Sequence, residues 1–426
     1  MENKNKIPLL IAIFININIV VGGGFFISAE TIGIKGGLLS PLIWILVGLL
    51  ILPLAMILAN LAKNDPVAGG IYFYSQKHIG PTWGFISGWT YLIGCIAGNS
   101  VLIVAIKNMI FKIGPNYLQQ NSFSNLYEIL FITFFTILSF FNVVLLNKIN
   151  TIFTILKTIP FLLVIVGAFL LFKFENLSQI PTIPFSNFLG TIPIVLFAYV
   201  GIEACCSIAH IIKDGSKNTA RAIIISLFII IGLYSLIQFL ILGIHGSNLS
   251  NPFAAIIPLI FNNASLINIG NLILQLSILL SFLGGVYGIF YANNWILFTM
   301  AKEKALPFPK VLSKTNKFNS PWICVLLQAF ITILFITISK DEVTLMTMSD
   351  FGVVIAYILS VISFIYLYKK DKKWISISAI ITCLLLLHVC FKNLSSAGIQ
   401  YLVPFLLLLI IGFVCYKTTK LKYFSN

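Results

Sequence analysis

VVGGGFF, residues 20–26, puts three consecutive glycines in the middle of the first long apolar run of the chain. Glycine is a weak helix former, so a helix that passes through this stretch is expected to open there. A helix opened inside a membrane exposes main-chain N–H and C=O groups, and each unpaired group costs several kcal/mol in hydrocarbon. The role of the glycines therefore depends on whether this run lies in a membrane and on which groups pair with the exposed main chain.

The composition identifies an integral membrane protein. Of the 426 residues, 59% are apolar and 9% are charged, and the mean hydropathy is +1.03. These values lie far outside the range of soluble domains, so the lipid bilayer is the expected environment. Because one span needs about 20 apolar residues, the apolar runs predict an all-α protein of about twelve transmembrane helices, centred near residues 18, 51, 95, 134, 162, 200, 232, 280, 330, 354, 382 and 407.

The placement of the positive charges predicts the orientation. With the N-terminus inside and about twelve spans, most of the 27 lysine and arginine residues fall in inner segments, as the positive-inside rule requires. We therefore expect both termini in the cytoplasm, and the AT-rich codon usage implied by the many Ile, Asn and Lys residues suggests a bacterial inner membrane. A net charge of +15 would suggest a nucleic-acid partner in a soluble protein, but here the placement of the charges along the chain matters more than their sum, and no nucleic-acid partner is expected. The oligomeric state stays open.

A second apolar run, residues 192–218, is interrupted at comparable depth, where Gly201 stands next to Glu203. Five spans separate the starts of the two interrupted runs. This spacing predicts two five-helix halves of inverted topology, at about residues 7–173 and 188–370, with two additional helices at about 373–417.

The two interruptions together suit a zwitterionic amino acid. Gly22, Gly23 and Gly24 would bring bare N–H groups to a ligand, and a half-helix that starts near Phe25 would present its positive end to a carboxylate. In the second run, the carbonyls of residues 197–200 would be free to accept hydrogen bonds from an ammonium group. The alternative for each interruption alone is that small residues let helices pack closely.

Two ionisable residues lie within spans, where such groups are costly and usually functional. Glu203 is a candidate proton site; the alternative is a buried glutamate held by neighbouring hydroxyls. Lys157 could supply a positive charge where other transporters bind sodium; the alternative is an amine that extends to the inner interface. Asp350 and Glu128 lie near span ends and are expected at the interface.

Nothing in the sequence indicates an enzyme, a metal site or a bound cofactor. The four histidines are scattered without a partner at ligand spacing, and no nucleotide-binding loop or nucleophile–base arrangement occurs.

Four ordered segments resemble the amino acid–polyamine–organocation (APC) transporter family. Residues 20–28, VVGGGFFIS, resemble its G-S-G-I-F signature, with Gly23 in place of the serine. Residues 65–94 resemble the P-x-x-G-G-x-Y-x-Y…G-x-x-x-G-F-x-x-G-W segment. Residues 197–223 resemble the sixth-helix F-x-G-x-E and the loop after it, and residues 299–321 resemble the eighth-to-ninth loop.

The resemblance implies a LeuT-like fold with broken helices one and six, a substrate site between helices one, three, six and eight, and alternating access. It also implies the roles of individual residues. The coupling positions fall on Lys157 and Glu203, and the substrate-binding positions fall on Val20, Gly22, Gly23, Gly24, Asn99, Phe197, Val200, Glu203 and Phe290.

We therefore expect a sodium-independent secondary transporter of amino acids, driven by protons or by exchange. One alternative is a polyamine or organocation antiporter of the same fold, although a diamine should need a second intramembrane acid near Glu203, and no clear one is present. The other alternative is a non-transporting membrane sensor, against which the lack of an output domain counts. The sequence does not identify which amino acid is carried.

Overall fold

The computed structural model describes residues 6–113, 121–141, 143–368 and 371–424. In these residues the fold is helical, and the bridges Ile7–Ile212 and Ala68–Ile208 are isolated pairs outside any strand. The α-helices are α1 (Leu9–Val20), α2 (Gly23–Gly36), α3 (Ser40–Asn64), α4 (Gly70–Ile79), α5 (Pro81–Ile113), α6 (Asn121–Ser139), α7 (Val143–Leu156), α8 (Thr158–Leu171), α9 (Phe174–Ser178), α10 (Phe185–Leu189), α11 (Ile192–Phe197), α12 (Ala204–Ser207), α13 (Gly215–His245), α14 (Ile257–Ile260), α15 (Ala264–Lys302), α16 (Pro309–Leu312), α17 (Trp322–Ile338), α18 (Glu342–Tyr368), α19 (Lys373–Ala397) and α20 (Ile399–Phe424).

The helices confirm an all-α, multi-span membrane protein. Within the described residues, 7 helical stretches are long and apolar enough to cross a bilayer, and four shorter apolar helices accompany them. Every expected span centre lies in a helix except residue 200, which lies in the unwound segment between α11 and α12. The total of about twelve spans stays a prediction, because interrupted helices are too short to be recognised as spans on their own.

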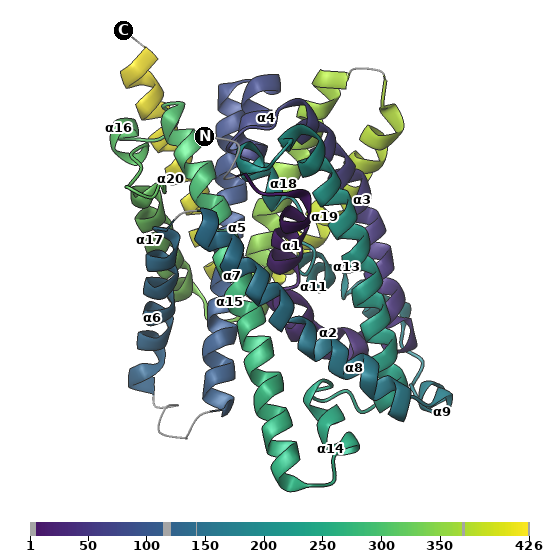
Figure 1. The fold of residues 1–426 in the computed structure, drawn as a ribbon. Coiled ribbons are helices and arrows are strands. Elements are labelled where there is room, and N and C mark those ends of the chain that lie inside the picture. The colour runs from purple at the N-terminus through teal and green to yellow at the C-terminus, as the bar shows by residue number, and fades with distance from the viewer. Residues whose placement is uncertain (1–5, 114–120, 142, 369–370, 425–426) are drawn as a thin grey trace.

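The first helix lies inside the bundle. α1 packs against α13, α7 and α15, while α5 packs along α18 and α3 along α13 (Figure 1). α1 begins and α20 ends at the end of the bundle where α16 lies, here called the α16 end. α9 and α14 lie at the opposite end, here called the α14 end (Figure 1).

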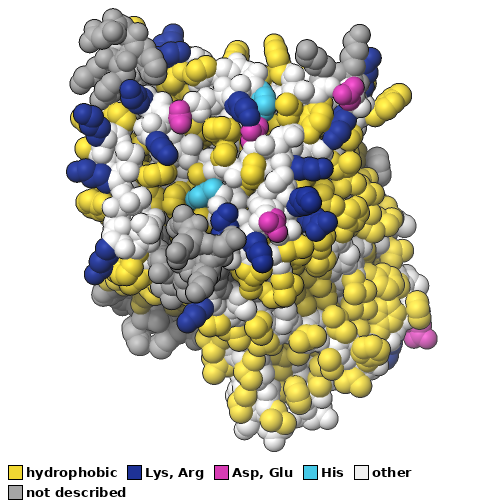
Figure 2. All heavy atoms as spheres, turned by 45° about the horizontal axis from the view of Figure 1, so that its top comes forward, with side chains coloured by type: hydrophobic (Ala, Val, Ile, Leu, Met, Phe, Trp, Pro, Cys, Tyr) yellow, Lys and Arg dark blue, Asp and Glu magenta, His cyan; other side chains and the backbone are white. Residues whose placement is uncertain are grey.

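The α16 end differs in charge from the flank beside it. Figure 2 shows lysine and arginine side chains spread over the α16 end, with hydrophobic side chains covering the flank that leads away from it. Large apolar side chains such as Phe169 and Leu170 of α8 are exposed, as expected for lipid-facing positions. In the predicted sidedness, the α16 end, where α1 begins and α20 ends, is the cytoplasmic end.

Candidate functional site

The three glycines do open the first helix. α1 ends at Val20 and α2 begins at Gly23, two residues before the expected start. Gly22 is the N-cap of α2 and provides no side-chain cap. The first amides of α2 therefore point out of the helix end without a capping side chain, at the positive end of its dipole. Such an end suits a carboxylate.

Gly24 also serves close packing, the alternative that the sequence left open. A Cβ at this position would lie 2.7 Å from the Cα of Ala198, which belongs to the second interruption. The two interrupted helices therefore touch where Gly24 has no side chain.

The second interruption is an unwound segment between Phe197, where α11 ends, and Ala204, where α12 begins. Gly201 in this segment has φ +105°, a conformation that residues with a side chain rarely adopt. A Cβ there would also lie 2.5 Å from Cγ2 of Ile19 in α1. The glycine is thus required both by its backbone angle and by the contact with the first helix.

The main-chain carbonyls freed at the end of α1 are taken up by side chains from other helices. The Lys157 ammonium donates to the carbonyl oxygens of Asn18, at 2.7 Å, and Val21, at 2.6 Å. The Tyr234 hydroxyl donates to the Val20 carbonyl at 3.0 Å, and the Ser281 hydroxyl to that of Val21 at 2.9 Å. Lys157 is 1% exposed, so its amine does not extend to the protein surface. The alternative of an interfacial amine is therefore wrong for this structure.

One asparagine of α1 links the first helix to the second interruption. The Asn16 side chain donates to the carbonyl of Ile202 at 2.9 Å and accepts a hydrogen bond from the Cys205 amide at 3.3 Å. Sequence reasoning did not single out Asn16. The available signal was the pair of asparagines in IFININIV, residues 13–20, since polar amides are rarely placed at membrane depth without a partner.

Glu203 is fully buried and held by two hydroxyls. Tyr91 in α5 donates to its Oε1 at 2.7 Å, and Tyr357 in α18 donates to its Oε2 at 2.7 Å. This geometry is the one that the hydroxyl-held alternative describes. Neither tyrosine was predicted, because each lies more than 100 residues away from Glu203 in the sequence.

A small pocket lies between the two interruptions, with a volume of about 20 Å³. This volume is enough for about one water molecule, so the site is closed in this conformation. Five predicted residues line the pocket, namely Val20, Gly23, Gly24, Phe197 and Val200. Residues that were not predicted complete the lining, namely Ile19, Cys95, Gly98, Leu102, Ile289 and Ser349.

The other predicted site residues lie outside this lining. Gly22 caps α2 beside the pocket, and Glu203 is engaged by its tyrosines. Asn99 and Phe290 are fully buried on α5 and α15. Within the described part of the chain, neither side-chain polar atom of Asn99 has a hydrogen-bond partner. An amide in that condition can bind a ligand or a water molecule.

Asp350 and Glu128, which we expected near the membrane interface, are both buried within the helix bundle. Asp350 is 1% exposed inside α18, and no described residue forms a hydrogen bond with either carboxyl oxygen. Glu128 is also buried and pairs with Lys107 of α5 at 2.5 Å. The distance of a residue from the end of an apolar run does not reveal which neighbouring helix covers it.

Comparison with known proteins agrees with the motifs. Residues 7–420 match the family model described as amino acid permease. The chain is 27% identical to the serine/threonine exchanger SteT of Bacillus subtilis, over 87% of this chain and 84% of that protein. It is 23% identical to the branched-chain amino acid permease BcaP of B. subtilis, over 84% and 79% of the two chains. It is 26% identical to an arginine/ornithine antiporter of Latilactobacillus sakei, over 78% and 73%.

These matches confirm the resemblance inferred from the motifs and place the chain among transporters rather than enzymes. The family implies the LeuT-like fold, and the relatives are amino acid exchangers and permeases. The first helix is opened at its glycines, the run of residues 192–218 is unwound at Gly201, and the family model matches residues 7–420; we conclude that the chain belongs to the amino acid permease family of the APC superfamily.

Proposed function

We propose that the protein carries amino acids across a bacterial inner membrane by alternating access, without sodium, and driven by exchange or by protons. The supporting observation is that the two interruptions face one pocket, with uncapped amides at the start of α2 and the unwound segment after Phe197. Amides bind a carboxylate and main-chain carbonyls bind an ammonium group, so the pair fits the two charged groups that all amino acids share.

The closed pocket supports a mechanism in which the interrupted helices move apart. At about 20 Å³ it cannot hold an amino acid, so substrate entry requires the interrupted helices to separate. In the proposal, residues 7–173 and 188–370 form the inverted repeats that rock against each other, and residues 373–417 stand outside them. In the proposal, the α16 end with its lysine and arginine side chains (Figure 2) is the cytoplasmic face, and α1 begins and α20 ends there (Figure 1).

Lys157 supports independence from sodium. Its ammonium binds two carbonyls that the helix interruption frees, as a bound cation would. A fixed positive charge in that place leaves no need for an added cation. Glu203 is the second candidate coupling residue, because it is buried beside Gly201 and linked to α5 and α18 through its tyrosines.

A polyamine substrate is less well supported. A diamine lacks the carboxylate that the α2 amides would bind, and its second amine needs an acidic partner. The described residues that line the small pocket include no aspartate or glutamate.

The experiment is exchange in proteoliposomes that contain the purified protein and a mixture of amino acids inside. External radiolabelled serine, isoleucine, arginine and putrescine are supplied in turn, in sodium buffer and in sodium-free buffer. We expect exchange of at least one amino acid at equal rates in both buffers. A strict sodium requirement would contradict the role of Lys157, and transport of putrescine alone would contradict the carboxylate site.

A further inference from the structure

Asp350 is a buried acid that the transport proposal does not yet use. It lies in the long apolar helix α18 and is 1% exposed. In the described part of the chain, neither of its carboxyl oxygens has a hydrogen-bond partner. An ionised carboxylate in such a place costs several kcal/mol or more, whereas a neutral carboxylic acid costs much less. In this closed conformation Asp350 therefore holds a proton.

Glu203 is a buried acid in a different environment. It accepts hydrogen bonds from the hydroxyls of Tyr91 and Tyr357, each at 2.7 Å. Such donors replace water around a carboxylate, so Glu203 can keep its negative charge. Asp350 has no such donors among the described residues, so the two acids differ in the charge that their surroundings allow.

No positive charge lies beside Asp350 in the residues that the structure describes. α18 packs mainly against α5, α19, α4, α11 and α3. The Cys390 thiol of α19 interacts electrostatically with Asp350, but a thiol brings no positive charge, and α11 contains no titratable residue. The described basic side chains of the other helices are exposed or paired with another acid, namely Lys63, Lys77, His78, Lys107, Lys373, His388 and Lys392. None of these groups compensates the charge of an ionised Asp350.

The helix α18 connects Asp350 to the substrate pocket. Ser349, the residue before it, lines the closed pocket. Further along the same helix, Tyr357 binds Glu203 beside the second interruption. The main chains of α5 and α18 touch at this depth, because a Cβ at Gly94 would lie 2.7 Å from the Ser349 carbonyl oxygen. Opening the pocket at Ser349 therefore also changes the surroundings of Asp350.

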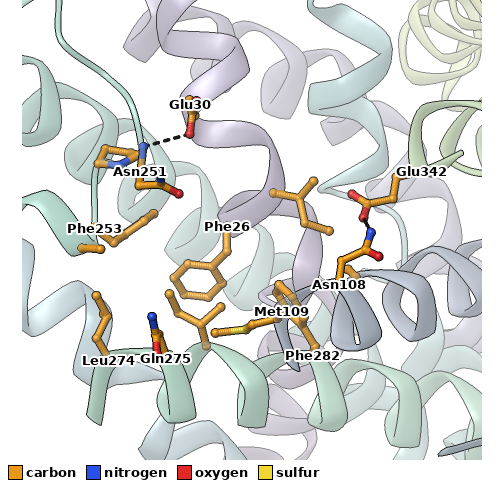
Figure 3. A pocket seen from close by; sticks show the side chains of 15 residues that line it. Phe26, Glu30, Asn108, Met109, Asn251, Phe253, Leu274, Gln275, Phe282 and Glu342 are labelled. Carbon is orange, nitrogen blue, oxygen red and sulfur yellow. Dashed lines mark hydrogen bonds between the residues drawn. The ribbon is translucent and has the colours of Figure 1, made fainter. Parts of the chain in front are cut away.

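A larger cavity begins at the same helix. Its volume is about 340 Å³, and it is lined by Glu342 at the start of α18 and by side chains of α2, α5 and α15 (Figure 3). This volume is enough for several water molecules. Asp350 lies about 12 Å further along α18 and is not among the described residues that line the cavity. In this conformation the acid is therefore separated from the cavity, and an opening of α18 would let water reach it.

We propose that Asp350 is the proton-binding group that couples amino acid transport to a proton gradient. The inference rests on the proposed transport and specifies its driving ion. When the site opens toward the larger cavity, a hydronium ion gives its proton to the Asp350 carboxylate and leaves a water molecule. The closed conformation holds the neutral acid. When the site opens to the opposite side, the acid returns the proton to water there, so one proton crosses with each amino acid.

The first test follows protons and amino acids together in proteoliposomes that contain a pH-sensitive dye, with the membrane potential held at zero. External L-serine and L-isoleucine serve as probes. With one proton per amino acid, a gradient of one pH unit should support about tenfold accumulation on the alkaline side. Asp350→Asn resembles the neutral acid but cannot release a proton. This variant should accumulate neither probe, and the amino acid that enters should no longer acidify the interior.

The matched control is Asp341→Asn, the same chemical change just before the start of α18. The Asp341 side chain is exposed and accepts a hydrogen bond from the Thr344 amide at 2.8 Å, which asparagine can also accept. This control should accumulate the probes as the wild type does. Equal losses in the two variants, no loss in Asp350→Asn, or transport by the wild type without proton movement would overturn the proposal.

Infrared spectroscopy tests the bound proton without transport and without any substitution. A protonated carboxyl group absorbs at a different frequency from a carboxylate, and a ¹³C label on aspartate shifts only the aspartate bands. In the wild type at neutral pH, we expect one protonated-carboxyl band that shifts with labelled aspartate. The other described aspartates are exposed or, for Asp65, paired with Lys77, so the band would belong to Asp350.

The two measurements separate this proposal from the transport function. Absence of the aspartate band would refute the proton site whatever the transport assay shows. A band together with transport that moves no protons would mean that Asp350 is not the coupling group, while amino acid transport stands. If neither probe moves in the wild type, the proposed function has failed, and the band alone decides whether Asp350 is a proton site.

Discussion

Substituting Gly24 by alanine tests whether the two interrupted helices must touch for the protein to work. A Cβ at Gly24 would lie 2.7 Å from the Cα and 3.0 Å from the Cβ of Ala198. Carbon atoms pack best at about 3.5–4.0 Å, so the two segments would have to separate by about 1 Å. Ala198 meets the new methyl group with main-chain and Cβ atoms, which cannot rotate away.

We expect a penalty of about 1–3 kcal/mol, the usual range for overpacking a filled site. If the penalty falls on the substrate-bound state, it corresponds to a rise in KM of roughly 5- to 150-fold. The assay is amino acid exchange over a range of substrate concentrations, together with thermal unfolding of the purified variant.

Gly232→Ala is the matched control. Gly232 lies in α13, and a Cβ there would meet nothing within 4 Å. Alanine favours a helix over glycine by about 1 kcal/mol, so this variant should be neutral or slightly more stable. A Gly24→Ala variant with the KM and melting temperature of the wild type would refute the required contact between the interruptions.

Three further substitutions test other contacts. Lys157→Met should abolish most exchange and lower the melting temperature. The substitution removes a charged donor from two freed carbonyls, and each such hydrogen bond contributes about 1.5–3 kcal/mol. Exchange at the wild-type rate would count against the role of Lys157. Tyr91→Phe removes one of the two hydroxyls on Glu203 and should destabilise the protein by about 1.5–3 kcal/mol in denaturation measurements, whereas an unchanged unfolding curve would show that the bond contributes nothing. Lys107→Met leaves Glu128 buried without its charged partner and should lower the free energy of unfolding by about 3–5 kcal/mol. The double variant Lys107→Met/Glu128→Leu should recover most of this loss. Equal stabilities of the single and double variants in denaturation measurements would contradict a buried ion pair.

The sequence determined the class of protein, the approximate helices, the family and the two interruptions. An apolar run is a local property of the sequence: the free energy of moving it from water into lipid depends on its own residues and not on distant partners. The glycines at residues 22–24 and 201 weaken the helix locally, so both interruptions were visible before any contact was known. Five of the nine predicted substrate-binding residues line the small pocket. Four of them lie at the glycine interruptions or next to them, and the fifth, Phe197, is the last residue of α11, so the local signal that located the interruptions located these residues too.

The tertiary structure alone decided which groups satisfy the opened helices. The carbonyls at the end of α1 are held by Lys157, Tyr234 and Ser281, which lie on three other segments of the chain. Glu203 is held by tyrosines from α5 and α18, and Asp350 is buried within the bundle. Such partnerships depend on the register and rotation of helices far apart in the sequence. Hydrophobicity does not encode them, because many rotations of a helix bury the same apolar surface while only a few align a donor with a freed carbonyl.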